Sequence, residues 1–260
     1  ITPGETPIAN LDRTSTDKQQ ALELGLLNSF NKKHLVGRES DNKLRARMSS
    51  FETASGLQSE APEIMDLSNE TKATFDLYGA SADNPTSYAS QVIMARRMIE
   101  AGVRFVEVID AVGACRDNWD AAHRDISSHE KYAKRVDQPA AALIQDLKQR
   151  GLFQDVLLIF CTEFGRTPWA QDGKGTKSRA HHPHAFSCWM AGAGIKGGVV
   201  HGETDDIGNK VVRDAVHVHD FHATVLHLMG LDHEKLVYRH AGRDFRLTDV
   251  HGHVVKQILA

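Results

Sequence analysis

The residues from Val156 to Pro168 read VLLIFCTEFGRTP. The first six residues of this stretch are apolar, and a run this short suits a buried strand better than a helix. The run leads to the carboxylate of Glu163, and a glycine turn at Gly165 follows it. Open α/β sheets place their chemistry where such strands end. The stretch therefore predicts a sheet strand with a functional site at its carboxyl end.

The segments on both sides of this strand predict a parallel sheet. Residues 103–109 (VRFVEVI) form a mainly apolar run that is expected to be a strand ending at Asp110, and residues 186–190 (FSCWM) form another. A helix that begins at Pro139 separates the first of these runs from the strand at residues 156–161. Strand, helix and strand in this order form a βαβ unit, whose strands are parallel and whose crossover is right-handed.

Further helices are predicted around this sheet. Apolar spacing indicates a helix over residues 87–101, which Gly102 ends in a left-handed conformation. Asp220 is expected to cap another helix, which stops at Gly230. A last helix is expected to pack its apolar side chains from residues 250–258. Helices of this kind would cover the faces of the sheet.

The N-terminal part of the chain is expected to be mainly helical. Leu22, Leu26 and Phe30 recur every four residues in the first of three amphipathic segments, and such a stripe is typical of a packing face. We therefore predict a mainly helical segment over residues 1–84 that packs on an α/β core over residues 85–260, the two together forming one domain.

The composition permits an enzyme and argues against several other classes. The chain has 260 residues, of which 41% are hydrophobic and 25% charged, so it can bury a proper core. A formal net charge of −3 gives no reason to expect nucleic acid or an anionic membrane as partner. No apolar run approaches the roughly 20 residues of a spanning helix. The three cysteines are widely spaced and indicate neither a disulfide framework nor a thiolate zinc site.

Carboxylates and imidazoles are predicted to gather at one edge of the sheet. Asp120 and His123 follow the first strand, Glu163 follows the second, and His181 and His182 precede the third. The carboxyl ends of parallel strands meet at one edge, so these groups can converge there. Oxygen and imidazole ligands together suit zinc foremost, with manganese, iron or calcium as alternatives. Successive side chains of an extended chain point to opposite faces, so only one of the two adjacent histidines is expected to bind the ion.

Each of these residues also has a purely structural interpretation. Asp120 could cap a helix whose exposed face carries His123, and Glu163 could pair with Arg166. The chain holds 15 histidines, and all but His34 follow residue 120. Six of these histidines lack the spacing of metal ligands, and we interpret them as packing or capping residues: His217, His219, His222, His227, His251 and His253.

Three long strings of the sequence resemble a known family. VLLIFCTEFGRTP (156–168), HHPHAFSCWMAGAGIKGG (181–198) and VHVHDFHATVLHLMGLDHEKLVYRHAGRDFRLTDVHG (216–252) are similar to the bacterial family called domain of unknown function 1501. That family is grouped by resemblance with the alkaline phosphatase and sulfatase superfamily. The resemblance implies a three-layer α/β/α sandwich with a mostly parallel sheet, whose N-terminal strands we expect from a segment upstream of Ile1. It also implies an extracytoplasmic location.

The resemblance implies a metal-dependent hydrolase of phosphate or sulfate esters, acting on a small-molecule or glycan ester. Asp120 with His123, then Glu163, then His181 or His182 follow the order of the superfamily's metal ligands, and of the last two we predict His181 as the ligand. Phe164 stands where the superfamily has a metal-binding histidine, which predicts at most one well-formed metal position.

Arginine, lysine and histidine side chains are expected to serve the reaction at this site. Arg166, Arg179 and Lys196 carry the charge that an ester's non-bridging oxygens need, and we predict Arg166 and His182 as the catalytic residues. No nucleophile is identified. The alternative is a non-catalytic member of the same family, a secreted binding or scaffold domain that has lost its site.

Overall fold

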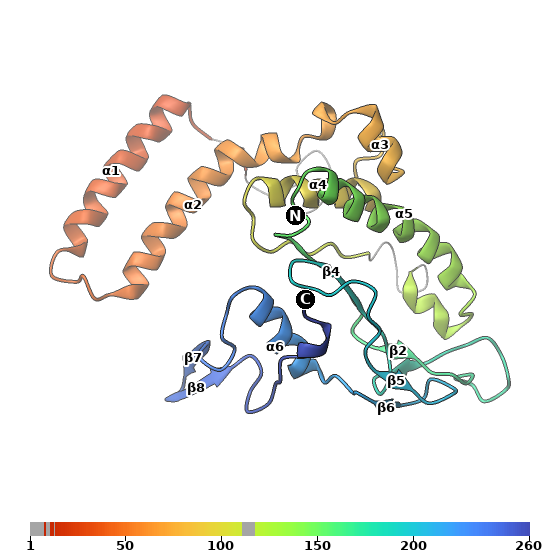
Figure 1. Ribbon diagram of the computed structural model, residues 1–260. Helices are drawn as coiled ribbons and strands as arrows, with labels where there is room; N and C mark the ends of the chain where they lie inside the picture. The colour runs from red at the N-terminus through yellow and green to blue at the C-terminus, as the bar shows by residue number, and fades with distance from the viewer. Residues whose placement is uncertain (1–7, 9–10, 13, 111–117) are drawn as a thin grey trace. The chain divides into compact units, whose positions relative to one another are not determined.

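The computed structural model describes residues 8, 11–12, 14–110 and 118–260 (Figure 1). The chain forms two compact units, Ile1–Ile109 and Asp110–Ala260. Within the described residues, every helix is too short or too polar to cross a membrane. The predicted division between residues 84 and 85 stays a prediction.

The first unit is helical, and polar side chains define where its helices begin. In each of its four α-helices the residue before the first turn accepts a hydrogen bond from a backbone N–H of that turn, which would otherwise lack a partner. The helices and their caps are α1 (Asp17–Leu35, Thr16), α2 (Asn42–Met65, Asp41), α3 (Lys72–Tyr78, Thr71) and α4 (Tyr88–Glu100, Ser87). A short 3₁₀ helix, η1 (Leu67–Asn69), precedes α3. The predicted helix over residues 87–101 is confirmed as α4, and Gly102 after it has a φ of 90°.

The core of the first unit lies along α4. Ile93 and Tyr78 are fully buried. Beside them a buried carboxylate, Glu70, lies between two arginines: its Oε1 is 2.8 Å from Nη2 of Arg96 and 2.9 Å from Nη1 of Arg97. The side chains of Glu70 and Arg96 are only 7% and 2% exposed. Apolar packing and this buried ion pair therefore stabilise the first unit around α4.

The predicted packing face of α1 is wrong. Leu22, Leu26 and Phe30 are 68%, 58% and 58% exposed, and no residue of α1 is buried. The half-buried leucines, Leu24 and Leu27, lie on the opposite side of the helix. The helix has two apolar faces, so the four-residue recurrence of one of them did not identify the face that is covered.

The second unit contains all the strands that the structure describes. Its elements, in chain order, are η3 (Trp119–His123), α5 (Ser128–Gln149), β1 (Leu157–Phe160), β2 (Gly165–Arg166), β3 (His181–His182), β4 (Trp189–Gly192), β5 (Glu203–Thr204), β6 (Val211–Arg213), α6 (Val218–Leu228), β7 (Val237–His240), β8 (Arg243–Arg246) and η4 (Lys256–Ile258).

The predicted α/β/α sandwich with a mostly parallel sheet is wrong. The described residues form four two-stranded sheets, all of them antiparallel. The strands expected at residues 156–161 and 186–190 exist as β1 and β4, but they pair in opposite directions, with Leu157 facing Gly192. Parallel strands need a long crossover, usually a helix, whereas β2 and β3 and the loop between them connect β1 to β4.

The strand expected at residues 103–109 is also wrong. These residues pair with no strand in the described part of the chain, and Phe105 and Ile109 are 68% and 65% exposed. An apolar run indicates burial in a strand only when a neighbouring strand is available. Without that strand, no βαβ unit forms.

Three helix boundaries differ from those expected. Pro139 lies inside α5, which begins at Ser128, so the proline does not mark a helix start. His217, not Asp220, caps α6, and Asp220 instead accepts a hydrogen bond from the backbone N–H of His217 as the other half of a capping box. Only η4 occupies the region of the expected last helix.

Candidate functional site

Three of the predicted ligand residues converge in the second unit. Asp120 and His123 lie on η3, and His181 lies on β3. Nε2 of His181 is 3.1 Å from Oδ1 of Asp120 and 3.0 Å from Nε2 of His123, which is itself 3.9 Å from the same carboxylate oxygen. A carboxylate oxygen and two imidazole nitrogens thus lie within 4.8 Å of one another, the spacing of ligands around a single metal ion. We call these three residues the Asp-His-His cluster.

Local backbone structure explains why the three side chains meet. The side chain of Asn118 accepts a hydrogen bond from the N–H of Asp120 and starts the turn that exposes Asp120 and His123 together. On the other side, β2 and β3 pair with Arg166 opposite His181. Gly165 permits this pairing, because a Cβ there would lie 2.5 Å from the carbonyl oxygen of Ala185. The short β2–β3 ribbon therefore carries His181 and Arg166 to η3.

The alternation of side chains along β3 separates the two adjacent histidines. His182 is buried, and its Nε2 donates to the carbonyl of Asn209 at 2.5 Å. His181 is exposed and belongs to the cluster. The structure thus gives His182 a partner away from the cluster, and its catalytic role stays a prediction.

Arg166 is the cation of the site. One of its terminal nitrogens, Nη2, donates to Oδ1 of Asp120 at 2.5 Å and to the carbonyl of Trp119 at 3.2 Å. The hydrogen bond from Arg166 to Asp120, and a second one from His181, hold the pKa of the Asp120 carboxyl below its usual value. Asp120 is therefore ionised at neutral pH. The other nitrogen, Nη1, is buried and has no hydrogen-bond partner among the described residues.

Gln171 fixes the orientation of the His123 ring. Its Oε1 lies 2.6 Å from Nδ1 of His123. An amide oxygen only accepts, so Nδ1 carries the proton and Nε2 presents its lone pair to the cluster. On the other side of the cluster the ring of Phe164 stacks on that of His181, with the centroids 3.9 Å apart. Both imidazoles are therefore held by neighbours outside the cluster.

Trp119 anchors η3 to α5. Its indole Nε1 donates to Oδ2 of Asp110 at 2.9 Å, and Arg135 of α5 donates to the same oxygen at 2.8 Å. Nε2 of His129 donates to the carbonyl of Trp119 at 2.8 Å. The sequence pattern did not indicate these contacts, because they join residues up to 25 positions apart.

Glu163 does not join the cluster. It lies in the bend after β1 and is exposed. The ion pair with Arg166 that was its structural alternative is replaced by the pair of Arg166 with Asp120. The role of Glu163 as a metal ligand stays a prediction.

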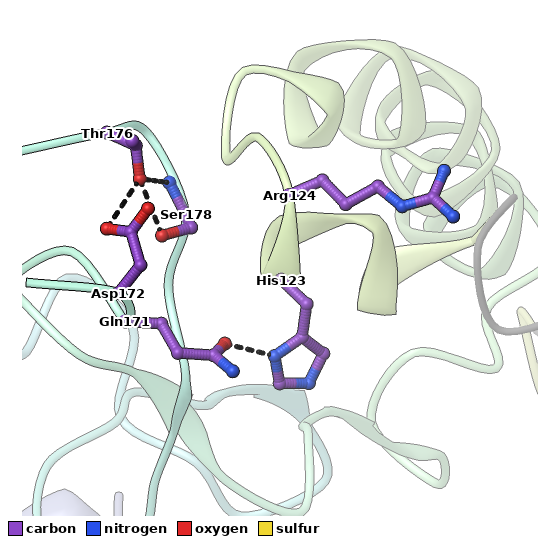
Figure 2. Close-up of a pocket in the computed structure, with 6 residues that line it drawn as sticks. All are labelled: His123, Arg124, Gln171, Asp172, Thr176 and Ser178. Carbon is purple, nitrogen blue, oxygen red and sulfur yellow. Dashed lines mark hydrogen bonds between the residues drawn. The ribbon is translucent and has the colours of Figure 1, made fainter. Parts of the chain in front are cut away.

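A cavity of about 320 Å³ adjoins the cluster beside His123 (Figure 2). Its walls come from the end of η3 and from the loop between β2 and β3. The residues that line it are His123, Arg124, Gln171, Asp172, Thr176 and Ser178. Because His123 belongs to both, a ligand in the cavity would lie next to the cluster.

Comparison with known proteins gives one match. The model of a family described as "Protein of unknown function (DUF1501)" matches residues 1–259. No curated protein and no solved structure matches the chain. The match confirms the first of the two resemblances in the sequence, while the resemblance to alkaline phosphatases and sulfatases has no support from these comparisons.

Proposed function

The chain belongs to the DUF1501 family, and on that premise we propose that it is a metal-dependent hydrolase of phosphate or sulfate esters. The observation that carries the proposal is the convergence of one ionised carboxylate and two imidazoles beside an arginine. Sites that combine a divalent ion with a nearby guanidinium suit substrates whose charge lies on several oxygens.

The donor set fits a divalent ion, zinc foremost. Oδ1 of Asp120 and Nε2 of His123 and of His181 would hold it. Three protein ligands of this kind are typical of catalytic zinc, which keeps a further position for water or substrate. When bound, such an ion lowers the pKa of water and polarises an ester oxygen. The hydrogen bond from His123 to Gln171 supports the fit, since ligating histidines usually donate their second nitrogen to an acceptor.

Arg166 is suited to hold the anionic part of the ester. Its Nη2 is engaged by Asp120, but its buried Nη1 lacks a partner among the described residues. A buried donor without an acceptor is costly, and a non-bridging oxygen of phosphate or sulfate would satisfy it. Arg166 would thus both orient Asp120 and bind the substrate.

Water is the proposed nucleophile. The two threonines nearest the site in sequence are already engaged: Oγ1 of Thr162 donates to the carbonyl of Phe164 at 2.8 Å, and Oγ1 of Thr167 donates to that of Trp169 at 2.9 Å. In the proposed reaction the water oxygen bonds to phosphorus or sulfur and releases a proton. The bond to the bridging oxygen breaks, and that oxygen leaves as an alcohol after taking up a proton.

The proposed function is tested with aryl phosphate and aryl sulfate esters and the zinc-loaded protein. We expect turnover of at least one ester class, and we expect Arg166→Met to lower kcat by about 100-fold or more, the typical cost of removing an anion-stabilising donor. The matched control is Arg239→Met, because the exposed Arg239 pairs with Asp244 outside the cluster. The proposal fails if neither ester class is turned over, or if both variants have the same activity.

Replacing Gln171 by leucine is expected to weaken zinc binding by about 10–100-fold, the usual effect of removing a partner of a ligating histidine. The reason is that His123 would lose the acceptor that fixes its ring at 2.6 Å. Competition with a chromophoric zinc chelator measures the affinity. Gln154→Leu, at an exposed position outside the cluster, is the control and should leave it unchanged. An unchanged affinity in Gln171→Leu would mean that His123 is not a ligand.

A non-catalytic binding or scaffold protein is the second candidate. The observation that favours it is the hydrogen-bond chain of Arg166, Asp120, His181, His123 and Gln171, in which the cluster satisfies itself without an ion. This candidate predicts that the natural chain does not bind zinc. The zinc affinity of the natural chain therefore separates the two.

A further inference from the structure

The cavity beside His123 indicates which kind of ester the site would take. Resting on the proposed function, we propose that this cavity binds the alcohol part of the ester, and that this part is an uncharged, hydroxyl-rich group such as a sugar ring. The carrying observation is that all six residues lining the cavity are polar.

Polar side chains line the cavity, and aliphatic side chains do not. Pockets for aryl or alkyl groups are lined mainly by apolar side chains with few polar ones. Here the amide nitrogen of Gln171 can donate two hydrogen bonds, while its oxygen is hydrogen-bonded to His123. The hydroxyl of Thr176 donates to Asp172 and lies 2.8 Å from that of Ser178, so these two hydroxyls offer a ligand their remaining lone pairs as acceptors. A group with several hydroxyls can exchange its bonds to water for bonds to these atoms.

The two walls of the cavity are joined to each other by backbone hydrogen bonds. The N–H of Arg179 donates to the carbonyl of Ala122 at 2.8 Å, and the N–H of Ile126 donates to that of Lys177 at 3.0 Å. These bonds connect the loop between β2 and β3 to the end of η3. The cavity is therefore formed in the protein before a ligand enters, which lowers the entropic cost of binding.

Asp172 places a negative charge on the loop wall of the cavity. Figure 2 shows Asp172 on the loop wall with Thr176 and Ser178, while the guanidinium of Arg124 points away from the other five residues. A backbone hydrogen bond from Lys174 lowers the pKa of the Asp172 carboxyl, which is therefore ionised at neutral pH. An alcohol part with its own negative charge, such as a uronic acid, would be repelled.

Binding of unesterified sugars tests the proposal without any turnover. The probes are methyl glucoside, methyl glucuronide and phenol, and the binding constants come from chemical-shift changes in NMR titrations. We expect the protein to bind methyl glucoside more tightly than the other two. In Asp172→Asn, which keeps an acceptor for Lys174, we expect the affinity for methyl glucuronide to rise by about fivefold, the effect of removing one unit charge near the ligand.

Two further measurements complete the test. Asp206→Asn, an exposed aspartate outside the cavity, is the matched control and should bind the three probes as the natural chain does. The proposal is overturned if phenol or the glucuronide binds the natural chain as tightly as the glucoside, or if Asp172→Asn and Asp206→Asn behave alike. The proposed function fails separately, when no ester is hydrolysed although the glucoside binds.

Discussion

The His181→Ala variant is expected to retain no zinc at a concentration that saturates the natural chain. His181 supplies the only ligand that β3 contributes to the cluster, and its Nε2 is within 3.1 Å of both other ligand atoms. Without it, Asp120 and His123 remain, and two ligands on one short turn hold zinc far less tightly than three preorganised ones. Equilibrium dialysis followed by elemental analysis measures the loss.

The control for this experiment is another histidine of the second unit. His227 lies on the exposed side of α6, outside the cluster, so His227→Ala should bind as much zinc as the natural chain. Circular dichroism of both variants checks that they are folded. Equal zinc content in His181→Ala and the natural chain would mean that the ion binds elsewhere, and the cluster would then be a hydrogen-bonded structural feature.

The Glu70→Ala variant is expected to lower the free energy of unfolding of the first unit by about 3–5 kcal/mol, the usual effect of removing one partner of a buried ion pair. The substitution leaves the guanidinium of Arg96, which is 2% exposed, and that of Arg97, which is 18% exposed, without the carboxylate between them. Arg96 keeps its ion pair with Glu100, which is 29% exposed, so part of its charge stays compensated.

Far-ultraviolet circular dichroism during urea denaturation measures this loss, because most of the described helical residues lie in the first unit. Tryptophan emission reports the second unit separately, since Trp119, Trp169 and Trp189 all lie there. Glu52→Ala, an exposed position on α2, is the matched control and should change stability by less than about 0.5 kcal/mol. If the two variants denature at the same urea concentration, the ion pair does not stabilise the unit.

The same ion pair predicts how stability depends on pH. Burial raises the pKa of Glu70, but the hydrogen bonds from Arg97 and Arg96 lower this pKa by more than burial raises it. The folded-state pKa is therefore below the ordinary value of 4.5. A carboxyl with a depressed folded-state pKa stabilises the fold above its unfolded-state pKa, and this contribution is lost as pH falls through the folded-state pKa. The natural chain should therefore lose stability below about pH 4.5, and Glu70→Ala should lose less. An equal loss in both would assign the acid sensitivity to other groups.

The neighbourhood of the candidate site was better predicted from the sequence than the fold around it. Asp120, His123, His181 and Arg166 were expected together and lie together, whereas Glu163 and His182, which were expected with them, do not join the cluster. The expectation was met for a different reason, because an antiparallel β2–β3 ribbon, and not a parallel sheet edge, brings His181 to η3. Carboxylate, imidazole and guanidinium side chains next to predicted strands indicated the place of the candidate site, although the predicted direction of the strands was wrong.

The fold was mispredicted where the deciding contact is distant in sequence. The apolar run at residues 156–161 indicated a strand but carried no information on its partner or direction, and β4 supplied both. Pro139 resembled a helix start, yet α5 continues through it with Tyr132 and Leu147 buried on either side. The helix propensity of the preceding turns and this burial together outweigh the one backbone hydrogen bond that a proline removes.

The parts of the site that were missed have no local signal. Gln171 holds His123 across 48 positions, and Asp110 holds Trp119 and Arg135 through one carboxylate oxygen. A glutamine in a loop between strands has no distinguishing pattern in a single sequence. Only the three-dimensional arrangement identifies such residues.

The X-ray absorption spectrum of the zinc-loaded protein shows whether the Asp-His-His cluster holds the ion, because it reports the atoms around the ion. We expect four nitrogen or oxygen neighbours at about 2.0–2.2 Å with the outer-shell scattering of two imidazoles, from His123 and His181. A spectrum with sulfur at about 2.3 Å, with a different number of imidazoles, or with no retained zinc to measure would contradict the assignment of the Asp-His-His cluster as a metal centre.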